Sequence, residues 1–310
     1  MKTNIKTIGT RSPLQQIRRC WQLYLIMALP MLVIIIFSYG PMFGVQIAFK
    51  EFRARDGIWG SPWIGFLHFK TFFQSYQFRR VITNTLGISI YGLLAGFPIP
   101  IILAILINES SHNKFKKAVQ LITFAPHFIS TVVMTSIILM FLSVYGGPIN
   151  NLIAAMGGER IDFMARPGIF KSIYVWSGIW QSMGYSSVIY IAALSAIDPA
   201  LYEAATIDGA SKFQKILYID LPGIAPTIII LLILNSGHIM NVGYEKILLM
   251  QNPLNMPSSD VISTYVYRMG LENAQYSFSA AVGLFNSVVN AVLLVIVNQI
   301  ARKLGETSLW

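Results

Sequence analysis

Long apolar runs alternate with shorter polar stretches along nearly the whole chain, and this pattern predicts membrane-spanning helices. A helix rises about 1.5 Å per residue, so about 20 apolar residues cross the hydrocarbon core of a bilayer. Six runs are long enough, at about residues 22–45, 81–107, 118–144, 172–194, 223–240 and 278–300. Pro30 and Pro126 fall inside two of them, which membrane helices tolerate. The pattern therefore predicts an all-α membrane protein with six transmembrane helices.

Composition supports a membrane location. Of the 310 residues, 55% are hydrophobic and 12% are charged, whereas about a quarter of the residues of a soluble domain are charged. The net charge of +10 would suggest nucleic acid in a soluble protein, but here the basic residues flank apolar runs. We expect them to anchor helix ends at anionic lipid surfaces, so membrane lipids, and no nucleic acid, are the expected partners.

The chain is predicted to form one membrane domain over residues 22–300, between an N-terminal segment 1–21 and a tail 301–310. Six spans place both ends on the same side of the membrane. Lys and Arg are shared almost equally between the two sides, so their overall count does not decide the orientation. Arg18 and Arg19 abut the first span with no acid nearby, which favours a cytoplasmic N-terminus.

The polar stretch 195–222, between the fourth and fifth spans, is predicted to contain two short helices outside the bilayer. Asp198-Pro199 suits a helix start, and Gly209 is expected to end that helix. Ser211 can cap a second helix, which Leu221-Pro222 is expected to end before the next span. Such an element suits docking into a groove on another protein. From these residues alone, a plain loop that joins two spans is the favoured interpretation.

The spacing of residues in this stretch is more specific. Three residues separate Glu203-Ala204-Ala205 from Gly209, nine separate Gly209 from Ile219, and one separates Ile219 from Leu221-Pro222. This pattern resembles the signature loop of ABC importer permeases. The resemblance implies a coupling loop for a separate ATPase, with Glu203 pairing with a basic ATPase residue. The implied coupling residues are Glu203, Ala204, Ala205, Asp208, Gly209, Ala210, Phe213, Leu221 and Pro222.

The resemblance extends over nearly the whole chain, to the maltose-type carbohydrate permeases and their subgroup for polysaccharide-derived oligosaccharides. It is carried by residues 39–44, 47–50, 125–130, 241–245, 248–250, 252–253, 264–268, 275–278, 281–285 and 308–310. It implies the type I ABC importer permease fold in a bacterial inner membrane. It also implies a cytoplasmic signature loop, and hence cytoplasmic termini.

The same resemblance implies the partners. They are a second, different permease, two ATP-binding subunits and an extracytoplasmic sugar-binding protein. The chain has no Gly-x4-Gly-Lys-Ser/Thr loop to cradle phosphates. We therefore expect no enzymatic activity and no cofactor on this chain, with ATP and Mg²⁺ bound by the partner ATPase.

Polar and aromatic residues in the spans that flank the coupling loop are candidates for the sugar pathway. Aromatic rings cover the apolar faces of sugars, and amides bond their hydroxyl groups. Hydrogen bonding between helices would explain the amides equally well. The candidates are Trp180, Gln181 and Tyr185 on the fourth span, and Asn235, His238 and Asn241 on or just after the fifth.

Other functions find less support in the sequence. An ion-coupled secondary transporter would be expected to carry carboxylates inside its spans, and the predicted spans contain essentially none. A sensing or signalling subunit of an ABC complex stays open. The four histidines are scattered, so no metal site is predicted, and no catalytic constellation is present. The sugar is not identified. An acidic one is left open by the cations of the predicted external loop, Arg160, Arg166 and Lys171.

Overall fold

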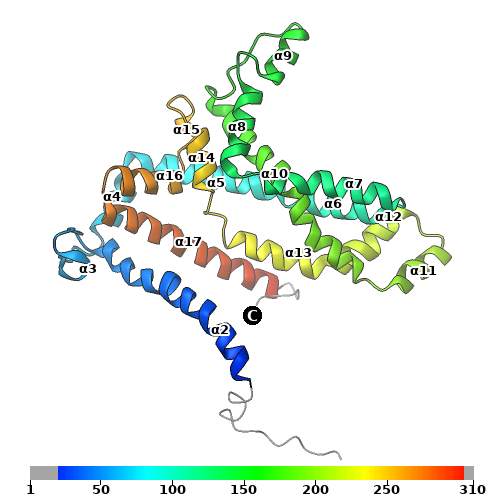
Figure 1. Ribbon diagram of the computed structural model, residues 1–310, viewed down its shortest axis with the longest axis horizontal. Helices are drawn as coiled ribbons and strands as arrows, with labels where there is room; N and C mark the ends of the chain where they lie inside the picture. Colours follow the sequence, from blue (N-terminus) through cyan, green and yellow to red (C-terminus); the bar gives the residue numbers. More distant parts are fainter. Residues whose placement is uncertain (1–19, 304–310) are drawn as a thin grey trace, which may run out of the picture.

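The computed structural model describes residues 20–303, and this part of the chain is helical nearly throughout (Figure 1). It contains no named strand among those residues, and Lys50 and Trp63 form an isolated bridge. The predicted all-α fold is confirmed. Most of the segment 1–21 and of the tail 301–310 lies outside the described residues, so their predicted sides of the membrane stay predictions.

Four continuous helical stretches are long and apolar enough to cross a membrane. Three of them are built from successive helical segments without a loop between them: α2 (Trp21–Ile34) with η1 (Ile35–Tyr39) and η2 (Gly40–Phe49), α5 (Tyr76–Gly96) with α6 (Pro98–Glu109), and α12 (Lys212–Lys215) with η4 (Ile216–Asp220) and α13 (Leu221–Ser236). The fourth is the single helix α17 (Tyr276–Lys303).

Two bent helix pairs bring the number to six when each pair is taken as one span. α7 (Asn113–Phe124) and η3 (Ala125–Phe128) turn by 103° into α8 (Thr131–Leu142), and α10 (Pro167–Ser195) turns by 70° into α11 (Pro199–Ile207). The third span, predicted over 118–144 with Pro126 inside it, is thus sharply bent just after this proline. Pro126 lies in η3, and the Ser130 side chain caps a new helix by accepting from the N–H of Val133.

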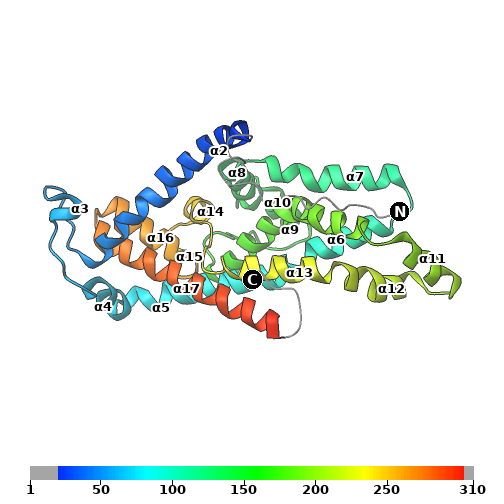
Figure 2. The ribbon, with the colours of Figure 1, turned by 90° about the horizontal axis from the view of Figure 1, so that it is seen from below.

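Shorter helices lie in the connections, mostly at the end of the molecule away from α11 (Figures 1 and 2). They are α3 (Gly57–Gly60), α4 (Leu67–Gln74), α9 (Pro148–Ala155), α14 (Tyr244–Met250), α15 (Met256–Ser259), α16 (Ile262–Tyr267) and η5 (Arg268–Glu272).

Helix α10 is the centre of the packing, with contacts to α5, α6, α7 and α13. In the first half of α10, Val175 and Ile179 pack with Ile88 of α5, and at its C-terminal end Leu194 packs with Ile224 of α13. Gly184 lets α7 approach closely, because a Cβ there would overlap the carbonyl oxygen of Thr123. α10 thereby joins the middle of the molecule to the loop that begins with α11.

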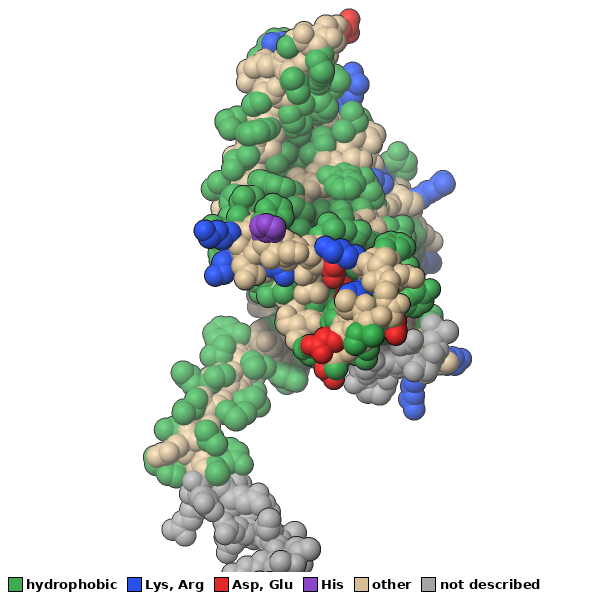
Figure 3. Space-filling view, turned by 90° about the vertical axis from the view of Figure 1, so that its right-hand side faces the viewer, with side chains coloured by type: hydrophobic (Ala, Val, Ile, Leu, Met, Phe, Trp, Pro, Cys, Tyr) green, Lys and Arg blue, Asp and Glu red, His purple; other side chains and the backbone are tan. Residues whose placement is uncertain are grey.

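Helix α2 leaves the bundle and runs apart from it (Figure 1). None of its residues is buried, and the chain returns to the bundle where η2 packs on α17. Hydrophobic side chains cover the part of it that faces the viewer in Figure 3. An apolar helix without cover from its own chain needs lipid or another protein around it.

A buried ion cluster joins α5 to the segment that precedes α17. Asp260 is fully buried and forms ion pairs of 2.9 Å with Arg80 of α5 and with Arg268 of η5. Asn84 of α5 donates to the backbone oxygen of Asp260 at 3.1 Å. The basic residues that flank the apolar runs are expected to anchor helix ends at lipid surfaces, but Arg80 makes this internal contact instead.

We expect Asp260→Asn to destabilise the protein, because it leaves two arginines without their shared counter-ion. Breaking a buried pair costs about 3–5 kcal/mol. Since the arginine side chains are 31% and 24% exposed, we expect about 2–3 kcal/mol. Thermal unfolding in detergent, followed by tryptophan fluorescence, measures this. Glu51→Gln, which breaks the exposed pair of Glu51 with Arg53, is the matched control and should change little. Equal effects of the two variants would contradict the assignment.

Candidate functional site

The predicted loop between α10 and α13 begins as the sequence indicates. The Asp198 carboxylate accepts a hydrogen bond from the N–H of Ala200 at 2.9 Å and caps α11. Gly209 follows α11 with φ of +74°, a conformation that costs other residues about 1–2 kcal/mol. Ser211 and Gln214 then form a capping box at the start of α12. The predicted helix, turn and second helix start are confirmed.

The predicted end of the second helix at Leu221-Pro222 is wrong. The helix continues from Lys212 to Ser236 and forms the beginning of the fifth span. Pro222 is accommodated because a π-turn, η4, precedes it, in which the N–H of Leu221 donates to the carbonyl of Ile216. Any force on α12 is therefore transmitted directly along α13.

The loop protrudes at one end of the long axis in both views (Figures 1 and 2). Glu203, Ala204, Asp208 and Gly209 are exposed, as is Phe213 at 68%. Figure 3, which faces this end, shows acidic side chains beside hydrophobic ones. The remaining predicted coupling residues complete the loop: Ala205, Ala210 and Leu221 are partly buried, and Pro222 is exposed. The end thus offers a carboxylate and apolar side chains without cover.

Two polar contacts that the sequence did not reveal fasten α11 to the next helix. The Tyr202 hydroxyl donates to the Asp220 carboxylate, which is fully buried. Lys215 of α12 donates to the Thr206 hydroxyl at 2.7 Å. The only sequence signal for the first contact was a carboxylate, Asp220, between the apolar residues Ile219 and Leu221. α11 and the start of α13 are thereby held as one unit.

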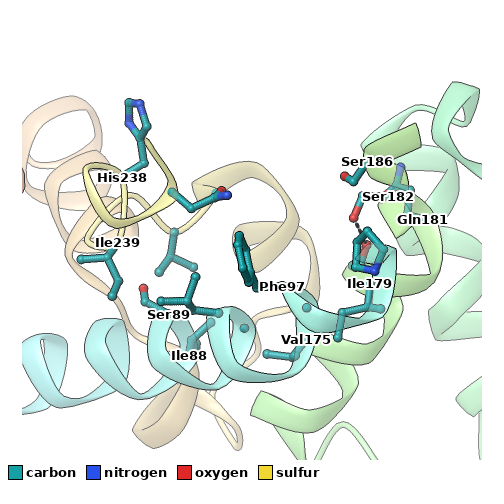
Figure 4. A pocket seen from close by; sticks show the side chains of 18 of the residues that line it. Ile88, Ser89, Phe97, Val175, Ile179, Gln181, Ser182, Ser186, His238 and Ile239 are labelled. Atoms are coloured by element: carbon teal, nitrogen blue, oxygen red, sulfur yellow. Dashed lines mark hydrogen bonds between the residues drawn. The ribbon is translucent and has the colours of Figure 1, made fainter. Parts of the chain in front are cut away.

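A cavity of about 650 Å³ lies between α5, α10, α13 and the segment that follows α13. Figure 4 shows His238 on one wall and Gln181, Ser182 and Ser186 of α10 on the opposite wall, with Phe97 between them and Ser89 of α5 below His238. Five of the six predicted pathway residues line this cavity: Gln181, Tyr185, Asn235, His238 and Asn241.

These five side chains also have partners within the chain. Gln181 donates to the carbonyl of Ile129 at 2.9 Å, and Asn235 donates to the carbonyl of Leu231 on its own helix at 2.8 Å. The ring of Tyr185 stacks on His127 with centroids 3.9 Å apart.

Asn241 is held most firmly. Its oxygen accepts from Asn286 and Asn290 of α17, both at 2.9 Å, and its amide nitrogen lies 3.5 Å from Nδ1 of His238. Binding of sugar and hydrogen bonding between helices are therefore compatible, and the pathway role of these residues stays a prediction.

Trp180 is separate from the group. Its side chain is 46% exposed and does not line the cavity. The arc of α10 that contains Gln181 and Tyr185 is wide enough for Trp180 to face elsewhere.

The cavity also has lining residues that the sequence did not single out, among them Ser89 of α5, Phe97 between α5 and α6, and Lys246 of α14. Burial lowers the pKa of Lys246 to about 8. Within residues 20–303 no three His, Cys, Asp or Glu side chains are grouped so as to hold a metal ion.

Residues 96–306 match the family described as binding-protein-dependent transport system inner membrane component. The chain belongs to this family. It is therefore a permease, the membrane component of an ABC importer.

Curated relatives cover most of the permease. It is 42% identical to Protein LplB of Bacillus subtilis (strain 168) over 93% of this chain and 91% of that one. It is 40% identical to the polygalacturonan/rhamnogalacturonan transport system permease protein YteP of the same organism, over 93% of this chain and 90% of that one. Identity at this level over nearly full length supports one shared fold.

Two solved structures share this fold. A chain in the crystal structure of a bacterial ABC transporter involved in the import of the acidic polysaccharide alginate matches with a TM-score of 0.87 and 44% identity, over 94% of this chain and 99% of that one. A second structure, of a bacterial alginate ABC transporter in complex with an alginate pentasaccharide-bound periplasmic protein, matches with 0.88 and 42%, over 96% and 100%. The type I importer permease fold is thus confirmed.

Membership of this family argues against an ion-coupled secondary transporter. The buried carboxylate of Asp220 need not carry an ion, since it accepts a hydrogen bond from the Tyr202 hydroxyl at the loop between α10 and α13.

We expect Tyr202→Phe to loosen α11 in the permease, because it removes the donor to the buried Asp220. A hydrogen bond to a charged group contributes about 1.5–3 kcal/mol, so amide hydrogen exchange in residues 199–212 should accelerate about tenfold or more. Hydrogen exchange with mass spectrometry measures this. The control is Tyr218→Phe, which removes the hydroxyl of a tyrosine in η4 that is 76% exposed. Equal exchange in both variants would show that the contact does not fasten α11.

Proposed function

We propose that this permease carries oligosaccharides or polysaccharide fragments across a bacterial inner membrane in an ATP-driven importer. The observation that carries the proposal is the cavity between α10 and α13, whose walls combine hydroxyl and amide groups with aromatic rings. Sugars need such walls because their hydroxyl groups bond polar side chains while their ring faces pack on aromatic ones. The names of the relatives that transport polygalacturonan or alginate support the same class of cargo.

Transport requires partners. We propose a second, different permease, two ATP-binding subunits that hold ATP and Mg²⁺, and an extracytoplasmic sugar-binding protein. The chain carries no phosphate-binding Gly-x4-Gly-Lys-Ser/Thr loop, in agreement with hydrolysis on a separate subunit. The uncovered side of α2 suits contact with a second permease and with lipid. The alginate transporter solved with a loaded periplasmic protein supports delivery by a binding protein.

The geometry suggests how the motion of an ATPase reaches the sugar. α11 would dock in a cleft of the ATPase with Glu203 facing a basic residue, which places the loop and both termini in the cytoplasm. Closure of the ATPase pair would displace α11. Because α11 follows α10 directly and is bonded to the start of α13 through Tyr202 and Asp220, the two cavity walls would move relative to each other. Access to the cavity would then switch from one side of the membrane to the other.

We expect the double variant Glu203→Ala with Gly209→Pro to lose the ATPase subunits, because it removes the exposed carboxylate and the left-handed turn that shapes the loop. Affinity purification of the tagged permease from membranes, followed by identification of the bound proteins, measures this.

The matched control is Glu51→Ala with Gly57→Pro. It removes another exposed carboxylate and another glycine of positive φ, +65°, at the opposite end of the molecule. The control should keep the ATPase subunits. If the loop variant retains as much bound ATPase subunit as the wild type, coupling through α11 is contradicted. If the intact permease, inserted and folded, binds no ATPase and gives no ATP hydrolysis stimulated by oligosaccharide in proteoliposomes, the proposed function itself fails.

A further inference from the structure

The cavity contains one buried lysine with no acidic partner. Lys246 of α14 is 8% exposed, yet it lies in the wall of the cavity. Among the described residues that line the cavity none is Asp or Glu, and Lys246 is the one Lys or Arg. The ion pairs between described residues join Glu51 to Arg53 and Asp260 to Arg80 and Arg268, and none of them includes Lys246. A buried charge without a counter-ion is costly, and such groups commonly mark binding sites.

The lysine is held in place by neutral groups of α10. Its Nζ donates to the Ser177 hydroxyl at 2.9 Å and to the carbonyl of Tyr174 at 3.2 Å, and it lies 5.0 Å from the centre of the Tyr174 ring. An ammonium group has three hydrogens to donate, so two are used within the chain and one is free for a ligand. These contacts orient the charge but do not neutralise it.

The wall beside Nζ is open. Gly178 of α10 also lines the cavity, and a Cβ built there would lie 3.6 Å from Nζ. With glycine at this position, no side chain of residue 178 stands between the amine and the cavity. Lys246 is thus positioned to meet an anion that enters.

We infer that Lys246 binds a carboxylate of the transported sugar, and that the cavity selects acidic oligosaccharides of the uronate type. The inference rests on the proposed function and assigns the substrate class to the same cavity. The other polar groups of the lining, such as Ser182, Ser186 and Asn235, are neutral and suit sugar hydroxyls. The single charge therefore separates acidic sugars from neutral ones of the same size.

The location of Lys246 fits this role. It lies beside Tyr174, whereas the cavity extends along α10 to Tyr190, about 24 Å further at the rise of a helix. Tyr190 is the end nearer α11. In the proposed orientation, Lys246 therefore marks the extracytoplasmic part of the cavity, where a sugar released by the binding protein would arrive.

The cations that the sequence suggested for an acidic sugar are less well placed. Arg160 is exposed and donates to the carbonyl of Val144 at 2.7 Å. Arg160, Arg166 and Lys171 do not line the cavity. Lys171 belongs to α10 and lies about two turns before Lys246's partner Ser177, so it provides a control lysine on the same wall helix.

The test uses the assembled importer, purified in detergent without the binding protein, so that the selectivity of the binding protein does not contribute. The ligands are an oligomer of galacturonic acid and its methyl ester of equal length, which lacks the charges. Isothermal titration calorimetry gives the affinity of each for the wild type and for Lys246→Met, Lys246→Arg and Lys171→Met. Retention of the ATPase and of the second permease is checked for every variant.

We expect the wild type and Lys171→Met to bind the acid about tenfold or more tightly than the ester, as a charge-assisted hydrogen bond allows. Lys246→Met should lose this preference while still binding the ester, and Lys246→Arg should keep much of it. Equal affinity for acid and ester in the wild type would overturn the inference. Loss of the second permease from Lys246→Met would do so too, since the lysine would then serve assembly. If neither ligand binds any form or stimulates ATP hydrolysis, the proposed function fails and not only the role of Lys246.

Discussion

The contact between Tyr202 and Asp220 joins the two functional parts of this permease. α11 is continuous with α10 through a short turn at one end, and at the other it is bonded to the helix that becomes α13. α10 and α13 are also opposite walls of the cavity. Because the loop and the cavity are built on the same two helices, displacement of the loop would reach the cavity walls directly. Without this contact, α11 would be held to the helix that continues into α13 only by the Gly209 turn and the exposed hydrogen bond from Lys215 to Thr206.

The membrane imposes the other constraint. Most of the side chains that face outward are apolar, so the interior must satisfy its own polar groups. It does so with amide networks such as that of Asn241, Asn286 and Asn290, and with the Asp260 cluster that joins α5 to the segment before α17. Lys50, Asp220 and Lys246 are buried charged groups that form no ion pair among the described residues, and of the three Lys246 is the one that lines the cavity. Lys246 therefore lies where a ligand would be expected.

Local chemistry made much of this predictable. Six apolar runs gave the spans, because hydrophobic length alone determines which segments cross a bilayer. Asp198, Gly209 and Ser211 gave the start, the turn and the restart of the coupling loop, because capping and positive φ act within a few residues. The prediction that a helix ends at Leu221-Pro222 was wrong, because a π-turn before the proline lets the helix continue and no simple sequence pattern predicts that turn.

Contacts between distant segments were beyond the sequence. Gln181, Tyr185, Asn235, His238 and Asn241 were grouped correctly because they follow the helical period on two spans known to be neighbours of the loop. Trp180 was on the same arc but faces away, and the direction of a side chain at the edge of an arc depends on packing. Lys246 was hidden in a predicted external loop, since only the fold brings α14 against α10.

The central claim is that α11 moves the walls of the cavity, and a distance across the cavity tests it most directly. Spin labels at Ser182 of α10 and at His238, in a chain whose Cys20 is replaced by serine, would report that distance by electron paramagnetic resonance in the assembled importer. The account predicts that trapping ATP on the ATPase changes the distance in the otherwise intact chain, and that Tyr202→Phe reduces the change while the ATPase stays bound. A distance that is the same with and without trapped ATP, in an importer that transports, would contradict it.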